Sequence, residues 1–475
     1  MSFNFLPFSS KMKSIGAADV QVKAFSRSCS KAFDESGCYV LEKDITPVSG
    51  LPRWQDLPAL DPQESDDMLK RCAILRLNGG LATSMGMEGG PKSLVPVHGE
   101  LTFLDIALHQ VLYARKRIGG QFLPLILMNS FNTSAQTMEH VAKYVEFLKQ
   151  PVHPELMQSR VPRIEADSLA PYSCPTDPQS EWCPPGHGDV YLAFFLTGVL
   201  PKLLSRGIRY LFLSNIDNLG AVVDSRIPFW MSQNKCPFLM EVSRRCNSDR
   251  KGGHLARSIH GNFILREYNM CAPSDKDDFI NIDKYNYFNT NNLWFDVEQL
   301  HQLITSKSGL LDLPVICNHK TLRVTPTSAV EVYQVETACG SIISSFPNAA
   351  ALEVPRSRFL PVKNLNDLLV ARSDLIKLGS DYIPQVYGKD FVPPVIKLPK
   401  EVRDLDDFSH MFPYGVPKIA RCRLLDVQSP IVFGKNVTCV GDVTITATQK
   451  VSIPNDTILE GTVHLNAEAS TLEDQ

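Results

Sequence analysis

Short apolar runs alternate with a segment of helical periodicity in the middle of the chain. Residues 73–77 and 210–214 are apolar runs that each lead into a polar turn, and residues 123–128 and 238–242 have the same character. Runs of this length between turn residues are typical of buried strands. Thr102 can cap a helix, because apolar residues recur at helical spacing from Leu104 to Leu112. Alternating strands and helices predict an α/β fold with a mostly parallel, doubly wound sheet.

The hydrophobic pattern differs at both ends of the chain. Residues 1–64 predict a helical extension followed by an irregular, proline-containing linker. After about residue 393, apolar residues recur at steps of about six among Gly, Asn, Asp and Thr, which predicts a short β-helix docked on the main domain. These positions are Val432, Val437, Val443, Ile445, Val451, Ile453 and Ile458. We therefore expect three parts, 1–64, 65–392 and 393–475.

The composition excludes several classes of protein. The 475 residues include 48 Lys and Arg and 51 Asp and Glu, a net charge of -3, so no basic field favours a nucleic acid. No apolar run approaches the roughly 20 residues that cross a bilayer. The N-terminus lacks the pattern of a secretory signal. The 12 cysteines are scattered without a CxxC pair, so we expect mostly free thiols. The chain is thus expected to be cytoplasmic, with neither a nucleic acid nor a membrane as partner.

A glycine-rich loop follows the first predicted strand. It runs from Leu77 to Ser93 and carries Lys92 near its far end. Exposed backbone N–H groups in such a loop can cradle phosphate oxygens, and a lysine adds positive charge. The loop is not a Walker A motif, because Pro91 occupies the position of that motif's second glycine. A flexible turn with a surface lysine is the structural alternative.

Three further positions near predicted strand ends or helix starts could carry chemistry. His187 stands between two glycines, where a ligand can approach the backbone. Asp217 follows the strand 210–214, where a carboxylate is able to hold Mg²⁺. Lys363 ends a cationic run ahead of a predicted helix, where charge and helix dipole favour an anion. Each position also has a structural explanation: a structural histidine, a side-chain turn or solvated surface charge.

Taken together and in this order, these segments and the amide-rich run 288–294 resemble the UDP-glucose pyrophosphorylases of eukaryotes, especially of protists. The resemblance extends from about residue 72 to the β-helical pattern. It implies a Rossmann-like nucleotidyltransferase domain followed by a C-terminal left-handed β-helix. It also implies that UTP and glucose 1-phosphate are converted reversibly into UDP-glucose and pyrophosphate with Mg²⁺.

The resemblance also implies roles for individual residues. The implied nucleotide contacts are Leu77, Asn78, Gly79, Gly80, Lys92, Met128, Gln158 and Gly186. The implied sugar-phosphate contacts are His187, Asn215, Gly253, Glu267 and Asn291. Asp217 corresponds to the metal position, and Lys92, Lys363 and Asp217 are the expected catalytic residues. Two positions depart from the family: Ala82 replaces a glycine, and Cys339 replaces a small residue or Met, with no evident chemical consequence.

The implied reaction is an in-line displacement in which a phosphate oxygen of glucose 1-phosphate attacks the α-phosphorus of UTP. Catalysis then consists of alignment and charge cancellation, without a protein nucleophile. Two alternatives stay open: a related uridylyltransferase for another sugar 1-phosphate, such as N-acetylglucosamine 1-phosphate, and a non-catalytic nucleotide-sugar sensor. The sequence leaves the oligomeric state open, and we expect a monomer.

Overall fold

The computed structural model describes residues 3–34, 39–86, 89–325, 328–388 and 391–465. The chain forms two compact units, each assembled from separate stretches of sequence. Unit 1 contains residues 1–79, 115–215 and 223–355, and unit 2 contains residues 80–114, 216–222 and 356–475. The sequence predicts three continuous parts with boundaries at residues 65 and 393. The two units combine separate stretches of the chain, so they do not test these boundaries, which remain a prediction.

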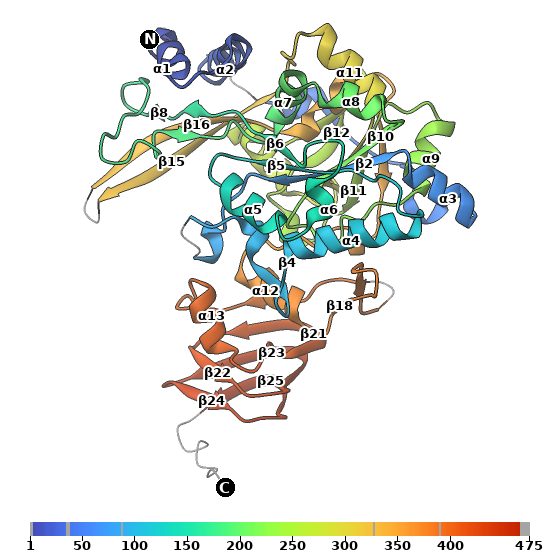
Figure 1. Cartoon of the computed structure of the whole chain (residues 1–475). Helices are drawn as coiled ribbons and strands as arrows, with labels where there is room; N and C mark the ends of the chain where they lie inside the picture. Colours follow the sequence, from blue (N-terminus) through green and yellow to red (C-terminus); the bar gives the residue numbers. More distant parts are fainter. Residues whose placement is uncertain (1–2, 35–38, 87–88, 326–327, 389–390, 466–475) are drawn as a thin grey trace. The chain divides into compact units, whose positions relative to one another are not determined.

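Unit 1 is built around a mixed sheet of ten strands (Figure 1). The strands are β1 (Ile45–Pro47), β2 (Cys72–Asn78), β5 (Leu125–Asn129), β6 (Glu155–Met157), β10 (Tyr210–Asn215), β11 (Phe238–Arg244), β12 (His254–Ser258), β13 (Phe263–Arg266), β14 (Tyr287–Asp296) and β17 (Ala350–Glu353). The main path is β1-β12-β14-β10-β2-β5-β6, and β11 joins β14 to β17. Only β1, β13 and β14 run against the other strands. The predicted α/β fold with a mostly parallel sheet is therefore confirmed.

The central strands are buried along nearly their whole length. All described positions of β2 and β5 are buried, and β10 is buried up to Ser214. A strand that is covered on both faces has a continuous apolar sequence, and for this reason these central strands could be predicted. The helices α7 (Val190–Thr197), α8 (Val199–Leu204) and α11 (Val297–Ser306) share one hydrophobic cluster with these strands.

The N-terminal extension is helical, as predicted, and packs within unit 1. Helices α1 (Leu6–Ser14) and α2 (Asp19–Ala32) lie beside the long hairpin of β15 (Val315–Thr325) and β16 (Ser328–Thr337) (Figure 1). A second hydrophobic cluster joins them, with Phe8, Phe25 and Cys29 from the helices and Trp182 and Val335 from the body of the unit. This burial fixes the extension to unit 1.

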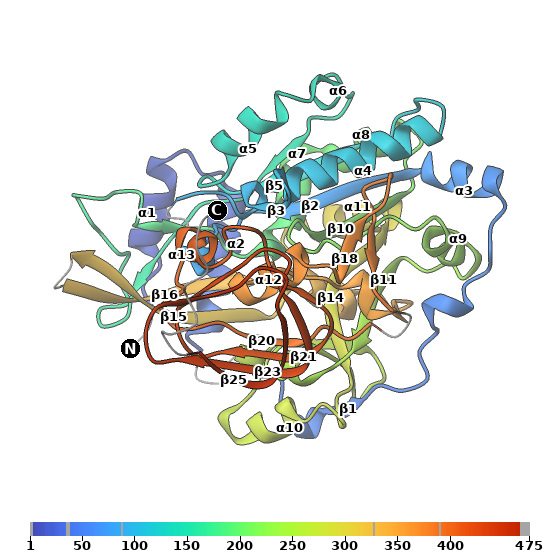
Figure 2. The ribbon, with the colours of Figure 1, turned by 90° about the horizontal axis from the view of Figure 1, so that it is seen from below.

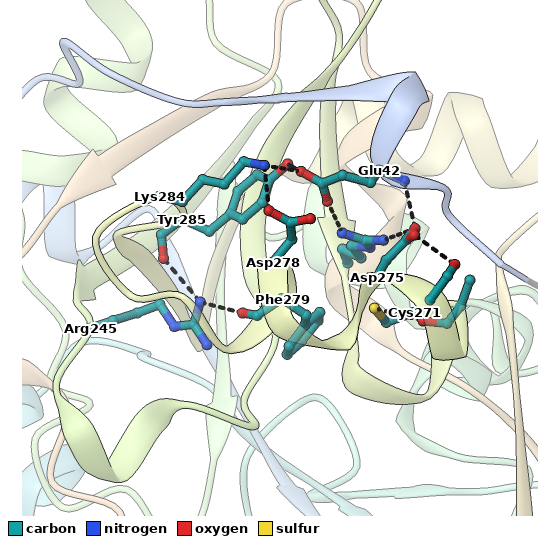
Figure 3. Close-up of polar contacts among 11 residues, drawn as sticks. Glu42, Arg245, Cys271, Asp275, Asp278, Phe279, Lys284 and Tyr285 are labelled. Atoms are coloured by element: carbon teal, nitrogen blue, oxygen red, sulfur yellow. Dashed lines mark hydrogen bonds and ion pairs between the residues drawn. The ribbon is translucent and has the colours of Figure 1, made fainter.

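A network of charges ties the segment after the extension to the sheet (Figure 3). The fully buried guanidinium of Arg266 lies 2.6 Å from the carboxylate of Glu42 and 2.9 Å from that of Asp275. Glu42 also pairs with the ammonium of Lys284 at 2.7 Å and accepts the O–H of Tyr285 at 2.7 Å. Because buried charges are costly unless they are paired, this network holds the segment in one position.

Unit 2 contains parallel strands stacked in successive coils (Figure 2). One sheet has the order β20 (Val395–Lys397), β21 (Lys418–Val427), β23 (Thr438–Ala447) and β25 (Ile458–Leu465), and β22 (Ile431–Phe433) pairs with β24 (Val451–Ile453). The coils repeat every 18 to 20 residues, since Thr438 pairs with Ile458 and Ile431 with Val451, whereas Val443 pairs with Gly461. Of the recurring apolar positions, Ile458 is 67% exposed, and its neighbour Leu459 is buried instead.

Among the described residues, three α-helices lie wholly or largely in unit 2. Helix α4 (Phe103–Arg117) starts after Thr102, whose hydroxyl accepts the N–H of Asp105 at 3.1 Å, so the predicted cap is confirmed. Helices α12 (Leu365–Arg372) and α13 (Leu405–Met411) follow in the C-terminal part. Within the described ranges, no helix combines the length and hydropathy needed to span a membrane. The 11 cysteines in those ranges are free thiols, and Cys38 lies outside them.

Candidate active site

The implied nucleotide contacts of unit 1 gather at the carboxyl ends of neighbouring strands. Leu77 pairs with Met128 across β2 and β5, and the next pair is Asn78 with Asn129. The side-chain amide of Asn78 donates to Asn129 Oδ1 at 2.7 Å. The N–H of Gln158, just after β6, donates to the backbone oxygen of Asn129 at 2.8 Å. Ligands of open α/β sheets bind at this edge, so the sheet places these residues where a nucleotide would be expected.

Gln158 links two of the predicted glycine positions. Its Nε2 donates to the carbonyl of Gly186 at 2.7 Å. Its Oε1 lies so close to Gly79 that a Cβ there would stand 2.4 Å from it, so any larger residue at this position would displace the Gln158 amide. The Oε1 atom is buried and has no hydrogen-bond partner among the described residues. A buried acceptor without a partner is suited to a donor group of a ligand.

Two observations explain why position 186 is a glycine: its backbone conformation and the lack of space for a side chain. Its φ is +81°, a conformation that L side chains rarely adopt, and a Cβ would stand 2.5 Å from the carbonyl oxygen of Thr337. The N–H of Thr337 donates to the carbonyl of Pro185 at 3.0 Å. The loop before His187 is thus pressed against the end of β16 without space for a side chain.

Three of the implied sugar-phosphate residues are joined through a residue whose role the sequence did not reveal. The Nδ2 of Asn291 donates to Asn215 Oδ1 at 2.9 Å. The thiol of Cys339 donates to Asn291 Oδ1 at 3.3 Å, and the N–H of Cys339 donates to Nδ1 of His187 at 3.0 Å. In the sequence Cys339 stood out only as a departure from the family with no evident chemical consequence, whereas the structure gives it hydrogen bonds to two of the implied sugar-phosphate residues, His187 and Asn291.

Gly253 directly precedes strand β12 and Glu267 directly follows its partner strand β13, and the two residues lie against each other. A Cβ at Gly253 would stand 2.5 Å from the Glu267 carboxylate, so the glycine makes room for it. Burial raises the pKa of Glu267 from its ordinary value of 4.5 to about 7. A carboxyl group with this pKa exchanges its proton near neutrality, so it can donate or accept a hydrogen bond.

We expect the Glu267→Gln variant to lose a pH dependence of stability. The pKa of Glu267 is raised to about 7 in the folded protein. Between pH 4.5 and 7 the folded state therefore keeps a proton that the unfolded chain has released. Stability must then fall as the pH rises through this window, by up to about 1.4 kcal/mol per pH unit, and stay lowered above it.

Urea unfolding at about pH 5 and about pH 8 measures this effect. The difference between wild type and Glu267→Gln should be larger at the higher pH, with the variant the more stable. Glu139→Gln, a change at an exposed glutamate on α5 (Ser134–Val141), is the matched control and should show the same difference at both pH values. Equal behaviour of the two variants would contradict the expectation.

Unit 2 brings the three expected catalytic residues together. The Nζ atoms of Lys92 and Lys363 lie 2.6 and 2.9 Å from the same oxygen of Asp217, Oδ2. The side chains of Lys92 and Asp217 are 12% and 8% exposed, whereas that of Lys363 is 52% exposed. Burial by itself raises the pKa of Asp217, but the ammonium groups of Lys363 and Lys92 outweigh it and hold this pKa below its ordinary value of 3.8.

Short backbone contacts within unit 2 position these three side chains. The glycine-rich loop folds back on itself, because the N–H of Lys92 donates to the carbonyl of Gly80 at 3.1 Å. The N–H of Val362 donates to the carbonyl of Asp217 at 3.1 Å, which brings the following Lys363 to the carboxylate. Ala82 is buried with a φ of -86°, so its methyl group requires no strained backbone.

The structure assigns other tasks to two parts of the predicted chemistry. In the cationic run, Arg358 is buried and donates to the carbonyl of Val222 at 2.9 Å. In the amide-rich run, which forms the middle of β14, Asn292 and Trp294 donate to the buried carboxylate of Glu241 at 3.2 and 2.9 Å. Arg358 thus holds a backbone carbonyl and the two β14 side chains hold a buried carboxylate, so Lys363 and Asn291 are the candidates for substrate binding in these two runs.

One carboxylate of unit 2 fits a metal ion. Asp217 Oδ1 is buried without a hydrogen-bond partner among the described residues, while Oδ2 receives both lysines. A magnesium ion needs one or two carboxylates when phosphates of a substrate supply further oxygens. Across the described ranges, no three Asp, Glu, His or Cys side chains cluster as a metal site made by protein alone.

Comparisons with known proteins agree with one another. The family model described as UTP–glucose-1-phosphate uridylyltransferase matches residues 22–440. UTP–glucose-1-phosphate uridylyltransferase 2 of Dictyostelium discoideum is 36% identical, over 89% of this chain and 83% of its own length. The corresponding protein of Saccharomyces cerevisiae is 39% identical, over 84% and 79%. A mutant UDP-glucose pyrophosphorylase of Leishmania major, solved in complex with UDP-glucose, aligns with a TM-score of 0.89 at 35% identity, covering 98% of this chain and 100% of its own.

Proposed function

Because the chain belongs to the UTP–glucose-1-phosphate uridylyltransferase family, we propose that it converts UTP and glucose 1-phosphate into UDP-glucose and pyrophosphate. The observation that carries this proposal is the convergence of Lys92 and Lys363 on Asp217. Two ammonium groups on one carboxylate form a site with a surplus of positive charge. Such a site suits a reaction in which two phosphate groups approach each other.

In the proposed reaction, the lysines act on phosphoryl oxygens and no protein group becomes a nucleophile. A phosphate oxygen of glucose 1-phosphate forms a bond to the α-phosphorus of UTP while the bond to the pyrophosphate oxygen breaks. Lys92 and Lys363 stabilise negative charge on the oxygens around this phosphorus. Both ammonium groups can turn from Asp217 to the phosphates when these bind, because lysine side chains are flexible.

We propose Mg²⁺ as the cofactor and Asp217 as the residue that would hold it. The acceptor atom Oδ1, which has no partner among the described residues, supports this role. When bound, the ion would neutralise phosphate charge and align the oxygens of the two substrates. Asp217 has a lowered pKa and so stays ionised at neutral pH, ready to bind a cation.

The remaining residues are proposed to bind and orient the substrates. Asn78, Gly79, Gly80, Met128, Gln158, Gly186 and Leu77 are proposed to contact the nucleotide, and His187, Asn215, Gly253, Glu267 and Asn291 the sugar phosphate. The free acceptor Oε1 of Gln158 supports its part in this assignment, because a uracil ring offers an N–H donor.

We further propose that the coils of unit 2 form a left-handed β-helix, and that the protein is a cytoplasmic monomer. The parallel strands that repeat every 18 to 20 residues support the β-helix. The free cysteines of the described ranges are consistent with a reducing compartment.

Pyrophosphate release from purified protein tests the proposed function. The expected result is rapid release with UTP, glucose 1-phosphate and Mg²⁺, and little release when Mg²⁺ is replaced by a chelator. Parallel reactions contain galactose 1-phosphate or N-acetylglucosamine 1-phosphate. Release with one of these sugars alone would overturn the choice of glucose, and no release with any sugar would favour a nucleotide-sugar sensor.

A further inference from the structure

Every polar group of Cys339 is engaged by a different part of unit 1. Its N–H donates to Nδ1 of His187 at 3.0 Å, and its thiol donates to Oδ1 of Asn291 at 3.3 Å. Its carbonyl accepts the O–H of Tyr191 from helix α7 at 2.6 Å. The side chain of Cys339 is wholly buried at the start of a short 3₁₀ helix, Cys339–Ser345. Three bonds in three directions leave this residue little freedom to move.

The bond to His187 decides where the imidazole carries its proton. A ring nitrogen that accepts a backbone N–H has no proton of its own, so the ring of His187 is neutral and its proton resides on Nε2. His187 is therefore a donor through Nε2. A backbone N–H holds this tautomer without depending on any side chain at position 339.

The hydrogen bond from Cys339 to Asn291 fixes the orientation of two side-chain amides, those of Asn291 and Asn215. Burial raises the pKa of the Cys339 thiol, so it stays protonated and acts as a donor. Oδ1 of Asn291 receives this thiol, and hence its Nδ2 points to Oδ1 of Asn215. With Oδ1 of Asn215 occupied as an acceptor, the group that Asn215 offers to a ligand is its N–H donor. The backbone of Asn291 supports this orientation, with a φ of +58° and its N–H bonded to Asn289.

We propose that Cys339 is a positioning residue that turns His187, Asn291 and Asn215 into a set of hydrogen-bond donors for the sugar phosphate. This proposal rests on the proposed function, since glucose 1-phosphate presents acceptor oxygens on both its hydroxyls and its phosphate. Cys339 itself does not contact substrate. It acts through the three residues whose hydrogen-bonding direction it fixes.

Steady-state kinetics of Cys339→Ala and Cys339→Ser test the proposal. Cys339→Ala removes the thiol donor but keeps the backbone bond to His187. We expect its KM for glucose 1-phosphate to rise about three- to tenfold, the usual effect of one neutral hydrogen bond, while its KM for UTP stays unchanged. Cys339→Ser keeps a donor and should restore most of the affinity. Cys236→Ala is the control, because that buried thiol donates to the carbonyl of Phe238 near the amino end of β11 and touches none of these residues.

The selective rise of the KM for glucose 1-phosphate is the readout that a purely structural role would not produce, and nitrogen NMR of the histidines tests separately where His187 carries its proton. The expected spectrum assigns His187 the Nε2–H tautomer in the wild type and in Cys339→Ala. An Nδ1–H tautomer, or a Cys339→Ala variant with the kinetics of Cys236→Ala, would overturn the proposal. If Cys339→Ala does not fold, Tyr191→Phe, which releases the Cys339 carbonyl, must raise the same KM for the proposal to stand. A wild type that forms no UDP-glucose would refute the proposed function instead, and the tautomer would still be decided by NMR.

Discussion

The Lys363→Ala variant is expected to lose about 10²- to 10³-fold in turnover, because one charge-stabilising donor of a transition state is typically worth this much. Lys363 supplies one of the two ammonium groups at Asp217, and its side chain is half exposed. Its removal therefore costs little packing. The fold should persist, with an unchanged circular dichroism spectrum, while kcat for UDP-glucose formation falls.

A similarly exposed lysine of the same unit serves as the control for this variant. Lys397 is 58% exposed and pairs with Asp426 at 3.2 Å, so Lys397→Ala also removes one ammonium group from one carboxylate. Its turnover should equal that of the wild type. Lys363→Arg keeps the charge and should recover part of the activity. Near-normal turnover of Lys363→Ala would show that this lysine has no part in the reaction.

The Arg266→Ala variant is expected to lose about 3–5 kcal/mol of unfolding free energy, the usual consequence of removing one partner from a buried ion pair. The guanidinium of Arg266 is fully buried between the carboxylates of Glu42 and Asp275. Figure 3 shows Glu42 and Asp275 together with Lys284 and Tyr285 in this network. Without Arg266, two carboxylates lose a buried partner and a cavity remains.

Urea unfolding followed by circular dichroism measures this loss. The control is Arg53→Ala, which breaks a pair with Asp56 in the same unit, where both side chains are 54% exposed. An exposed pair of this kind contributes at most about 1 kcal/mol. If Arg266→Ala destabilised the protein no more than Arg53→Ala, the buried network would have no structural importance.

The strands were predictable from the sequence where burial alone determines them. Residues 73–77 and 210–214 lie inside β2 and β10, which are covered on both faces and hence apolar throughout. Strand β14 was missed, because its middle is polar: Asn292 and Trp294 bind Glu241, a residue about 50 positions earlier. No local pattern encodes a partner that is distant in the chain, so the amide-rich run was not predicted to be a strand.

The resemblance made it possible to predict which residues belong to the candidate site. It did not predict how these residues are arranged in space. Asp217 is 125 residues from Lys92 and 146 from Lys363, and their contact follows from tertiary structure. Cys339, in contrast, was not identified as a site residue from the sequence. A buried cysteine carries no catalytic signal in a sequence, and its importance lies in backbone and thiol bonds that become visible only in the folded chain.

The repeat of 18 to 20 residues in unit 2 restricts which changes of length this part of the chain can accept. A deletion of one residue between β23 and β25 would exchange the inward and outward faces of every later strand position, since side chains alternate. Removal of a whole repeat would instead preserve pairing and faces alike. Natural variation in the length of this region should therefore occur in full coils, or at the loops where one coil passes to the next.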